Sequence, residues 1–273
     1  MALQDAKISV LDRGFLFGDA VYEVIPAYAG YLFRLREHLT RFDQSLAGIR
    51  ITPPLSHQQW ERILQRLLIE GSDQLLYLQV TRGVAPQRDH AFPARIKPTV
   101  FAMTTPLAPY DFGAGVKVVT LDDIRWEYCH IKATTLLANV LLRQQALDMN
   151  CTEALLVRDG HVVEAAASNV FAVIDGVLRT PPKSHRLLPG ITRDLIIELA
   201  QDGGMAVEEK ELSVADLQRA SEIWLCSSSR EILPVIELNG AQLGEGQAGP
   251  LWKRMRELYL SYKQAFIKNH ESD

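Results

Sequence analysis

The sequence predicts a mixed α/β (α+β) protein built from two domains. Predicted strands and helices interleave along the chain without the strict strand–helix–strand alternation of a doubly wound sheet. The length of 273 residues exceeds that of one typical domain. Residues 107–115 contain a proline and two glycines, which is typical of a linker. We therefore expect a small N-terminal α/β domain at residues 1–106, an interdomain linker at 107–115 and a larger domain at 116–273.

The elements of the N-terminal domain follow from hydrophobic periodicity and turn residues. They are, in order, an extended segment at 7–10, turns at 12–14 and 17–19, a hairpin of 21–28 with 31–33, helices at 37–48 and 56–70, and strands at 75–82 and 98–104. The helix at 56–70 is the clearest of these elements, with Ser56 as its N-cap. One face of this helix carries Trp60, Ile63, Leu64, Leu67 and Leu68, so that face is predicted to be buried.

The larger domain is predicted from the same signals. Its elements are a strand at 116–120, a helix at 134–149, hairpins of 153–158 with 161–165 and of 170–174 with 177–179, a helix at 190–201, and a strand at 222–226. Each hairpin turns at an Asp-Gly pair, the strongest short hairpin signal. The helix at 134–149 places Leu137, Val140, Leu141 and Leu147 on one side, which predicts a buried face.

The overall charge gives no reason to expect nucleic acid or an anionic membrane as a partner. The formal net charge is −4, and 47% of the residues are apolar, which is ordinary for a globular protein. No segment approaches the roughly 18 uninterrupted apolar residues of a membrane span. A small anion remains a candidate ligand, because net charge does not test local basic residues.

The cysteines and the N-terminal segment predict a cytoplasmic protein. Cys129, Cys151 and Cys226 are an odd number at wide spacing, which argues against a disulfide framework. They form no CxxC pair of the kind that binds zinc. The first residues lack the apolar core of a signal peptide.

Lys132 lies where an extended segment meets a helix, among apolar neighbours. Desolvation disfavours the charged form of a lysine, so such a site lowers its pKa. A neutral amine is what a Schiff-base lysine needs to attack a carbonyl. For this residue alone, a lysine whose stem packs at a helix start is the more common interpretation.

Glu164 ends an apolar strand and is followed by small residues. A carboxylate in that position can hold a ring nitrogen protonated, as an electron-sink cofactor requires. Taken in isolation, a solvent-facing strand glutamate is the more frequent case.

Two segments are suited to bind a phosphate. Ile191 and Thr192, after Gly190, begin a helix, where free backbone N–H groups and the helix dipole attract anions. Ser227 and Ser228 place hydroxyl groups directly after a strand. Simple capping and turn formation explain either segment equally well. Arg41 could add charge to the same anion, but a solvated helix arginine is the simpler interpretation.

Arg88 and His90 lie two residues apart in a polar loop. In extended backbone, such residues point to the same side. Together they could bind one carboxylate, with the arginine bidentate. An ordinary polar loop remains the alternative. No second His or Cys stands at ligand spacing from His90, so we expect no metal site.

Taken together, these segments resemble the fold-type IV enzymes that use pyridoxal 5′-phosphate (PLP), the class IV aminotransferases. The resemblance runs from about Ile8 to Trp252 and is closest to the D-amino acid (D-alanine) transaminases. The matching segments are DRGFLFGDAVYEV from residue 12, CHIK from 129, EAAASNVF from 164, GITRD from 190 and PVIE from 234. Any one of these is modest, but five in the right order are highly specific. The resemblance implies a small α/β domain followed by a larger β-barrel-like domain with helices.

The resemblance assigns roles to individual residues. Lys132 matches the Schiff-base lysine, which also moves the proton between the substrate Cα and the cofactor C4′. Glu164 matches the partner of the pyridine nitrogen, and Leu188 a residue that packs on the ring. The phosphate cup is matched by Arg41, Ile191, Thr192 and Ser228, with Ser227 beside it.

The resemblance also implies the substrate class. Arg88 and His90, completed by Tyr22, resemble the carboxylate trap of D-alanine-type transaminases. In that family the loop reaches the active site of the neighbouring subunit, which implies a homodimer. The reaction implied is transfer of the amino group of a D-amino acid to a 2-oxo acid, by a ping-pong mechanism through a Lys132 aldimine. Fixing the α-carboxylate on one side of the ring would leave one hydrogen accessible to the lysine.

The chain departs from the family at two places. Residues 165–167 are Ala-Ala-Ala, where relatives often have small polar residues. Relatives also have a further N-terminal segment that forms an initial strand, so either that strand is absent or the start lies upstream.

Other functions remain open on the sequence alone. Within the class, these are a branched-chain L-amino acid transaminase, an (R)-amine transaminase and an aminodeoxychorismate lyase. Outside it, a thiol or serine hydrolase finds no nucleophile elbow or ordered Cys–His pair in its support. A catalytically inactive binding protein of the same fold is the last alternative.

Overall fold

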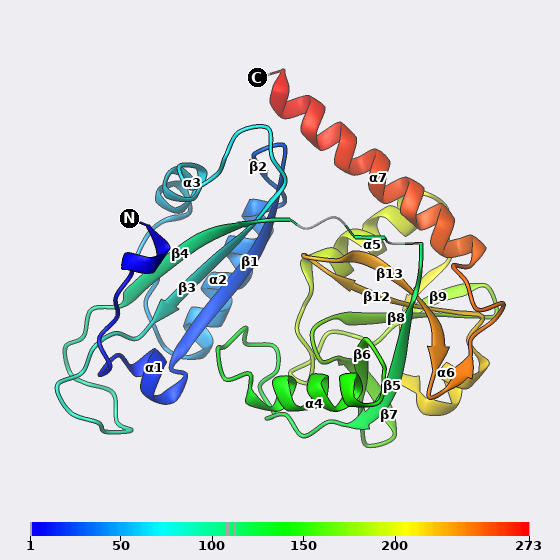
Figure 1. Cartoon of the computed structure of the whole chain (residues 1–273), viewed down its shortest axis with the longest axis horizontal. Coiled ribbons are helices and arrows are strands. Elements are labelled where there is room, and N and C mark those ends of the chain that lie inside the picture. The colour runs from blue at the N-terminus through cyan, green and yellow to red at the C-terminus, as the bar shows by residue number, and fades with distance from the viewer. Residues whose placement is uncertain (1, 108–109, 112, 273) are drawn as a thin grey trace. The chain divides into compact units, whose positions relative to one another are not determined.

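A computed structural model describes residues 2–107, 110–111 and 113–272. The chain divides into two compact units (Figure 1). The first comprises residues 1–108 together with 131–136, and the second comprises residues 109–130 together with 137–273. Part of the linker predicted at 107–115, namely residues 108, 109 and 112, lies outside the described residues.

The first unit is built on an antiparallel sheet of strand order β2-β1-β3-β4. The strands are β1 (Ala20–Tyr28), β2 (Tyr31–Leu32), β3 (Gln74–Thr81) and β4 (Thr99–Pro106), and the helices are η1 (Leu3–Asp5), α1 (Arg13–Phe17), α2 (Leu35–Gly48) and α3 (His57–Gln65). Helix α2 packs on β1, and its buried Leu39, Phe42 and Leu46 join the core of the sheet. Trp60 and Leu64 bring α3 into the same core.

The second unit contains a large mixed sheet of strand order β10-β9-β8-β12-β13-β5-β6-β7-β11, with β14 beside β13. Its elements are β5 (Val116–Asp122), α4 (Leu137–Asp148), β6 (Glu153–Arg158), β7 (His161–Ala165), β8 (Asn169–Ile174), β9 (Val177–Thr180), α5 (Ile191–Asp202), β10 (Val207–Glu209), β11 (Leu212–Ser213), α6 (Val214–Arg219), β12 (Glu222–Ser227), β13 (Glu231–Leu238), β14 (Ala241–Gln242) and α7 (Pro250–Glu271).

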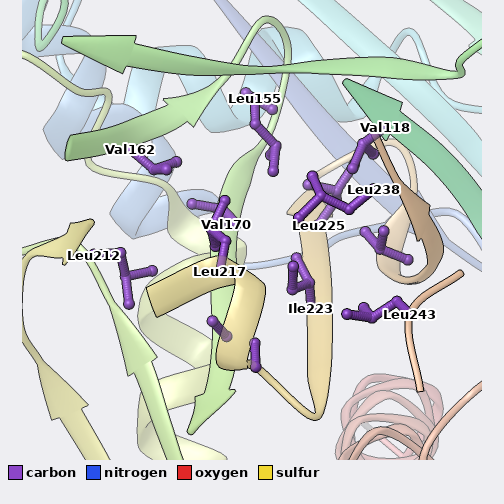
Figure 2. Packing of buried hydrophobic residues seen from close by; sticks show 14 of the residues in the cluster. Val118, Leu155, Val162, Val170, Leu212, Leu217, Ile223, Leu225, Leu238 and Leu243 are labelled. Atoms are coloured by element: carbon purple, nitrogen blue, oxygen red, sulfur yellow. The ribbon is translucent and has the colours of Figure 1, made fainter. Parts of the chain in front are cut away.

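This sheet curls around one hydrophobic core. Figure 2 shows Val170 of β8 in the same cluster as Val162 of β7 and Leu212 of β11, although these strands are far apart in the sheet order. Strands so far apart share a core only if the sheet bends back on itself. The predicted mixed α/β class, with a curled barrel-like sheet in the larger part, is therefore confirmed.

Helix α7 ends the second unit and was not predicted. Glu231, at the start of β13, anchors it. This carboxylate is buried, accepts a hydrogen bond from Lys263 at 3.0 Å and is paired with Arg256. Glu231 also has a φ of 49°, in the left-handed region that a side chain rarely adopts. The residue is therefore held in place against a backbone cost.

Several predicted elements were wrong in detail. Residues 12–14 do not form a turn, because the Asp12 side chain accepts a hydrogen bond from the Gly14 N–H and caps the short helix α1. The helix predicted at 56–70 ends at Gln65. Ile63, within it, and Leu67, beyond its end, are exposed rather than buried.

The predicted buried face of the helix at 134–149 was also wrong. Helix α4 buries Leu142 and Ala146 instead. The four leucine and valine side chains of the predicted face are between 47% and 72% exposed. Within a single chain, this apolar face has no cover.

Among the described residues, none of the helices combines the length and the apolar character needed to cross a membrane. The three cysteines are free thiols and are buried.

Candidate active site

Lys132 is held by the edge of strand β1. The Tyr22 N–H donates to the Lys132 carbonyl at 2.9 Å, and Ala133 pairs with Val21 in an isolated bridge. The Lys132 N–H donates to the Ser45 hydroxyl of α2 at 3.1 Å. These contacts place the segment 131–136 in the first unit. The structure thus fixes the backbone of Lys132 on both sides.

The side chain of Lys132 lies over Tyr22, one of the predicted substrate-binding residues. The ammonium nitrogen is 4.4 Å from the centroid of the Tyr22 ring. Tyr22 also stacks on Tyr77 at 5.6 Å between ring centroids. Burial raises the pKa of Tyr77 to about 12, with a smaller contribution from Tyr22. Tyr77 is therefore a neutral phenol near pH 7, stacked on the ring that Lys132 contacts.

Arg41 is buried rather than solvated, and its partner is Glu23. The Arg41 guanidinium donates to both carboxylate oxygens of Glu23, from Nε and from Nη2, at 2.7 Å each. His38 Nδ1 lies 2.8 Å from the same carboxylate. Glu23 comes directly after Tyr22 on β1 and, by strand alternation, faces α2. Glu23 was not among the residues predicted from the sequence to lie at the phosphate site.

Burial and ion pairing together set the charges of Glu23, His38 and Arg41. Burial by itself would raise the pKa of Glu23, but the charge and hydrogen bonds of Arg41, with help from His38, hold that pKa well below its usual range. Burial lowers the pKa of His38, although Glu23 opposes the shift. Glu23 is therefore ionised and His38 neutral near pH 7, with the His38 proton on Nδ1, where Glu23 accepts it.

The structure brings Arg88 and His90 together on the ring of Phe17. The Arg88 guanidinium carbon lies 4.8 Å from the centroid of the Phe17 ring. The His90 ring centroid is 5.2 Å from the same point. Both side chains belong to exposed residues. Phe17, from α1, was not among the predicted site residues, because nothing in the sequence ties it to a loop so far along the chain.

Glu164 is buried at the end of β7, in the second unit. It accepts hydrogen bonds from Arg125 Nη1 at 2.5 Å, from Asn169 Nδ2 at 3.1 Å and from the Leu188 N–H at 3.2 Å. Burial raises the pKa of Glu164, against the opposing effect of Arg125 and the Leu188 N–H. Glu164 is therefore a paired, buried acceptor and not a solvent-facing strand glutamate. Sequence reasoning did not single out Arg125 or Asn169.

Asn169 joins three of the predicted cofactor segments. Besides Glu164, its side-chain amide donates to the Leu188 carbonyl at 2.9 Å. Its backbone pairs with Cys226, next to Ser227 at the end of β12. A Cβ on Gly190 would lie only 1.9 Å from the Asn169 Oδ1. Within the second unit, the structure thus gathers Glu164, Leu188, the start of α5 and the end of β12 around one side chain.

The start of α5 has the features of an anion site. Gly190 is its N-cap and supplies no side chain, so the first N–H groups of the helix receive no cap from it. The helix has 12 residues, and its first two residues, Ile191 and Thr192, are buried. Ser228 begins the turn that follows β12. Since a glycine is the only residue that fits beside Asn169, the backbone here can approach a ligand closely.

In the loop at 165–167, Ala165 and Ala166 are buried and Ala167 is exposed. The Ala165 N–H donates to the Ser168 carbonyl at 2.7 Å, and the Ala166 N–H to the Ala154 carbonyl at 3.0 Å. The Ala166 carbonyl accepts from Asn139 of α4 at 2.8 Å. The loop is therefore ordered through its backbone.

The described residues contain no cluster of His, Cys, Asp and Glu suited to hold a metal ion.

The chain is similar to proteins of one family. The sequence profile of the amino-transferase class IV family matches residues 20–238. D-alanine aminotransferase from Staphylococcus haemolyticus is 38% identical over 263 residues, covering 94% of this chain and 93% of its own length. D-alanine aminotransferase from Bacillus licheniformis is 38% identical over 260 residues, covering 94% and 92%.

Solved structures give the same result for the fold. The branched-chain amino acid aminotransferase of Escherichia coli superposes with a TM-score of 0.88 at 28% identity, covering 96% of this chain and 91% of its own. The enzyme of Thermoproteus uzoniensis does so with a TM-score of 0.87 at 28% identity, covering 95% and 90%. The resemblance predicted from the sequence is confirmed: this chain is an aminotransferase and belongs to the class IV family.

Proposed function

We propose that this aminotransferase uses PLP to move the amino group of a D-amino acid, of the D-alanine or D-glutamate class, to a 2-oxo acid. The observation that carries the choice of substrate is the placement of Arg88 and His90 on one ring, Phe17. A guanidinium and an imidazole that contact the same ring suit a carboxylate, which the arginine can bind through two parallel hydrogen bonds. The D-alanine aminotransferases at 36–38% identity support the same choice.

The residues of the second unit fit the cofactor. Glu164 is a buried acceptor suited to a protonated ring nitrogen, and Leu188 is fixed beside it through its own N–H. The start of α5 and the end of β12, with Ile191, Thr192, Ser227 and Ser228, would hold the phosphate. When bound, PLP supplies an electron sink for the charge that develops at the substrate Cα.

The residues of the first unit fit the reacting atoms. Lys132 would hold the cofactor covalently and move the proton between the substrate Cα and C4′. Arg41, with its orientation fixed by Glu23, would add a positive charge for the phosphate. Tyr22 would complete the carboxylate trap formed by Arg88 and His90. With the carboxylate fixed, only one face of Cα is open to the lysine, and this selects the D-enantiomer.

A branched-chain L-amino acid transaminase is the second candidate. Enzymes named for that activity are the structural neighbours with TM-scores of 0.88 and 0.87. Likeness of fold is shared by the whole class, however, so it does not weigh against a substrate choice based on the trap residues.

We further propose that the protein is a cytoplasmic homodimer. The exposed apolar face of α4, formed by Leu137, Val140, Leu141 and Leu147, supports the dimer. A monomer rarely exposes so many large apolar side chains on one helix. The three buried free thiols are in keeping with a reducing compartment. In this dimer, Arg88 and His90 would serve the active site of the partner subunit.

The experiment that tests the function is a half-reaction with D-alanine and L-alanine given separately. Purified protein with PLP is expected to be yellow, and D-alanine alone should bleach the cofactor absorbance while L-alanine leaves it unchanged. Borohydride should fix PLP on Lys132, as located by mass spectrometry. Bleaching by L-alanine or L-leucine would favour the branched-chain activity. Repeated release of pyruvate from aminodeoxychorismate without any amino acceptor would favour a lyase, because the half-reaction of D-alanine itself yields only one pyruvate for each PLP. A protein that stays colourless with added PLP contradicts the proposal.

Arg88→Ala separates the trap from the rest of the site. The variant should retain the yellow colour and lose most turnover of D-alanine. Arg95→Ala, an exposed arginine in the same polar segment, removes the same charge and should behave like the wild type. If Arg88→Ala turns over D-alanine normally, the D-alanine assignment is wrong.

A further inference from the structure

The polar loop that carries Arg88 and His90 rests on Arg13 of helix α1. The Arg13 guanidinium donates to three successive backbone carbonyls of the loop. Nη1 donates to Asp89 O at 2.5 Å and to Ala91 O at 3.3 Å, and Nη2 donates to His90 O at 3.1 Å. The loop residues are themselves exposed, so this contact comes from a buried element to a surface segment.

Arg13 is in turn held rigidly. Its side chain is only 3% exposed, and its Nε donates to the Asp19 carboxylate at 2.8 Å. The Arg13 N–H donates to the Gly83 carbonyl at 2.9 Å. Asp19 also pairs with Arg82, from Nε at 2.7 Å and from Nη2 at 3.0 Å. Asp19 therefore pairs with two guanidinium groups, and its bond to Nε sets the plane of Arg13 before it meets the loop.

The chemistry of the contact suits arginine alone. A guanidinium presents five N–H donors in one rigid plane, so it can satisfy a carboxylate and several carbonyls at once. A lysine ammonium in the same place has three donors at a single point and cannot span residues 89–91 and Asp19 together. The Arg13 guanidinium carbon also lies 4.8 Å from the Phe17 ring centroid. Arg13 thus supports the backbone of the loop, and Phe17 supports the side chains of Arg88 and His90.

We propose that Arg13 is a positioning residue for the substrate carboxylate. It holds the backbone of residues 89–91 so that Arg88 and His90 stay together on Phe17. The inference rests on the proposed function of those two side chains. It assigns Arg13 no contact with substrate or cofactor. Its effect is to hold the trap ordered before the substrate arrives, which saves the cost of ordering the loop during binding.

The test compares the PLP-bound enzyme with Arg13→Ala, Arg13→Lys and Arg95→Ala. In Arg13→Ala, the amides of residues 84–97 should exchange with deuterium faster than in the wild type. KM for D-alanine should rise by about 10-fold to 100-fold, because the substrate must then bear the cost of ordering the loop as it binds. The kcat should change less, and the cofactor absorbance should remain. Arg13→Lys should fall between, and Arg95→Ala should match the wild type in every measurement.

Two outcomes would contradict the proposal. Unchanged exchange in residues 84–97 would show that Arg13 does not order the loop. Faster exchange with an unchanged KM would reduce Arg13 to a structural residue. If the wild type does not turn over D-alanine at all, the proposed function is wrong. The exchange data would still show whether Arg13 orders the backbone of residues 89–91. If Arg13→Ala does not fold, Arg13→Lys, which keeps the charge beside Asp19, provides the same comparison.

Discussion

Both buried glutamates of the candidate site are matched by a guanidinium. Glu23 is held by Arg41, and Glu164 by Arg125. Their surroundings differ, because Glu23 receives a second partner in His38, whereas Glu164 receives neutral N–H donors from Asn169 and Leu188. The pKa of Glu23 is lowered, because Arg41 and His38 outweigh the effect of burial. The pKa of Glu164 is raised, because burial outweighs the effects of Arg125 and the Leu188 N–H. Glu164 is therefore the better proton-sharing partner for a ring nitrogen.

A single methyl group on Gly190 should weaken cofactor binding. In Gly190→Ala, the new Cβ would lie 1.9 Å from Asn169 Oδ1. Asn169 would have to move away from Glu164 and Leu188, and the start of α5 would shift with it. We expect PLP affinity to fall by about tenfold or more, equal to about 1.4 kcal/mol. The measurement is a titration of the cofactor-free protein with PLP, followed by absorbance.

The matched control for this change is Gly113→Ala. Among the residues that the structure describes, a Cβ there would meet only the Asp111 carboxylate, at an ordinary contact distance of 3.5 Å. This variant should bind PLP as the wild type does. If Gly190→Ala keeps wild-type affinity, the start of α5 does not form the phosphate site.

At the residue scale, the sequence offered candidate site residues but not the residues that support them. Lys132, Glu164 and Arg88 were assigned roles through the family resemblance, and those roles stay predictions. Glu23 and Phe17 were missed, although both lie within a quoted motif. Strand alternation could have placed Glu23 opposite Tyr22. Phe17 had no such signal, because its contacts with the loop depend on tertiary structure.

At the element scale, periodicity predicted which segments are helices or strands better than which face is buried. Helix α4 shows why, since its two stripes are both apolar and the structure buries the one with Leu142 and Ala146. An apolar stripe indicates that a helix face is buried, but not whether its own chain or another chain buries it. Helix α1 was missed because its five residues are too few to show a period.

The attachment of α7 should depend on pH through Glu231. Burial by itself raises the pKa of this carboxyl, but Lys263 and Arg256 outweigh it and hold the pKa below its ordinary value of 4.5. A group with a depressed folded-state pKa stabilises the fold above its unfolded-state pKa. That stabilisation is lost as the pH falls through the folded-state value. Glu231→Gln should therefore unfold about 3 kcal/mol more easily than the wild type near pH 7, because two cations lose a buried partner.

The difference between the two proteins should shrink as the pH falls below 4.5, where the wild-type carboxyl also begins to lose its charge. Urea unfolding at a series of pH values measures it. Glu257→Gln makes the same change at an exposed position of α7 and should cost little at any pH. A gap between wild type and Glu231→Gln that stays constant down to pH 3 would mean that the ion pair is not the source of the effect.

At the scale of the whole molecule, each unit has its own core and its own share of the proposed site residues. Lys132, Tyr22 and the Arg88 loop belong to the first unit, and Glu164 with the start of α5 belongs to the second. Domain boundaries drawn along the sequence could not show that residues 131–136 pair with strand β1, since that pairing joins segments about a hundred residues apart in the chain. The family resemblance supplied the grouping of roles that periodicity could not.

The proposed dimer predicts activity in a hybrid of two inactive subunits. Lys132→Ala removes the lysine but keeps the trap loop, and Arg88→Ala does the reverse. If the loop serves the partner's site, a hybrid dimer holds one site with both residues intact and one site with neither. Hybrids isolated with two different affinity tags should then show about half of the wild-type turnover of D-alanine, since one site of the two is whole. If the loop serves its own subunit, both sites carry one defect and the hybrid stays inactive.

The control for this experiment pairs Lys132→Ala with Glu164→Ala. The proposed site takes both of those residues from one subunit, so no hybrid of these two variants contains a whole site. Recovery in the first hybrid but not in the control would assign the loop to the neighbouring subunit, and a hybrid as inactive as its parents would contradict that assignment.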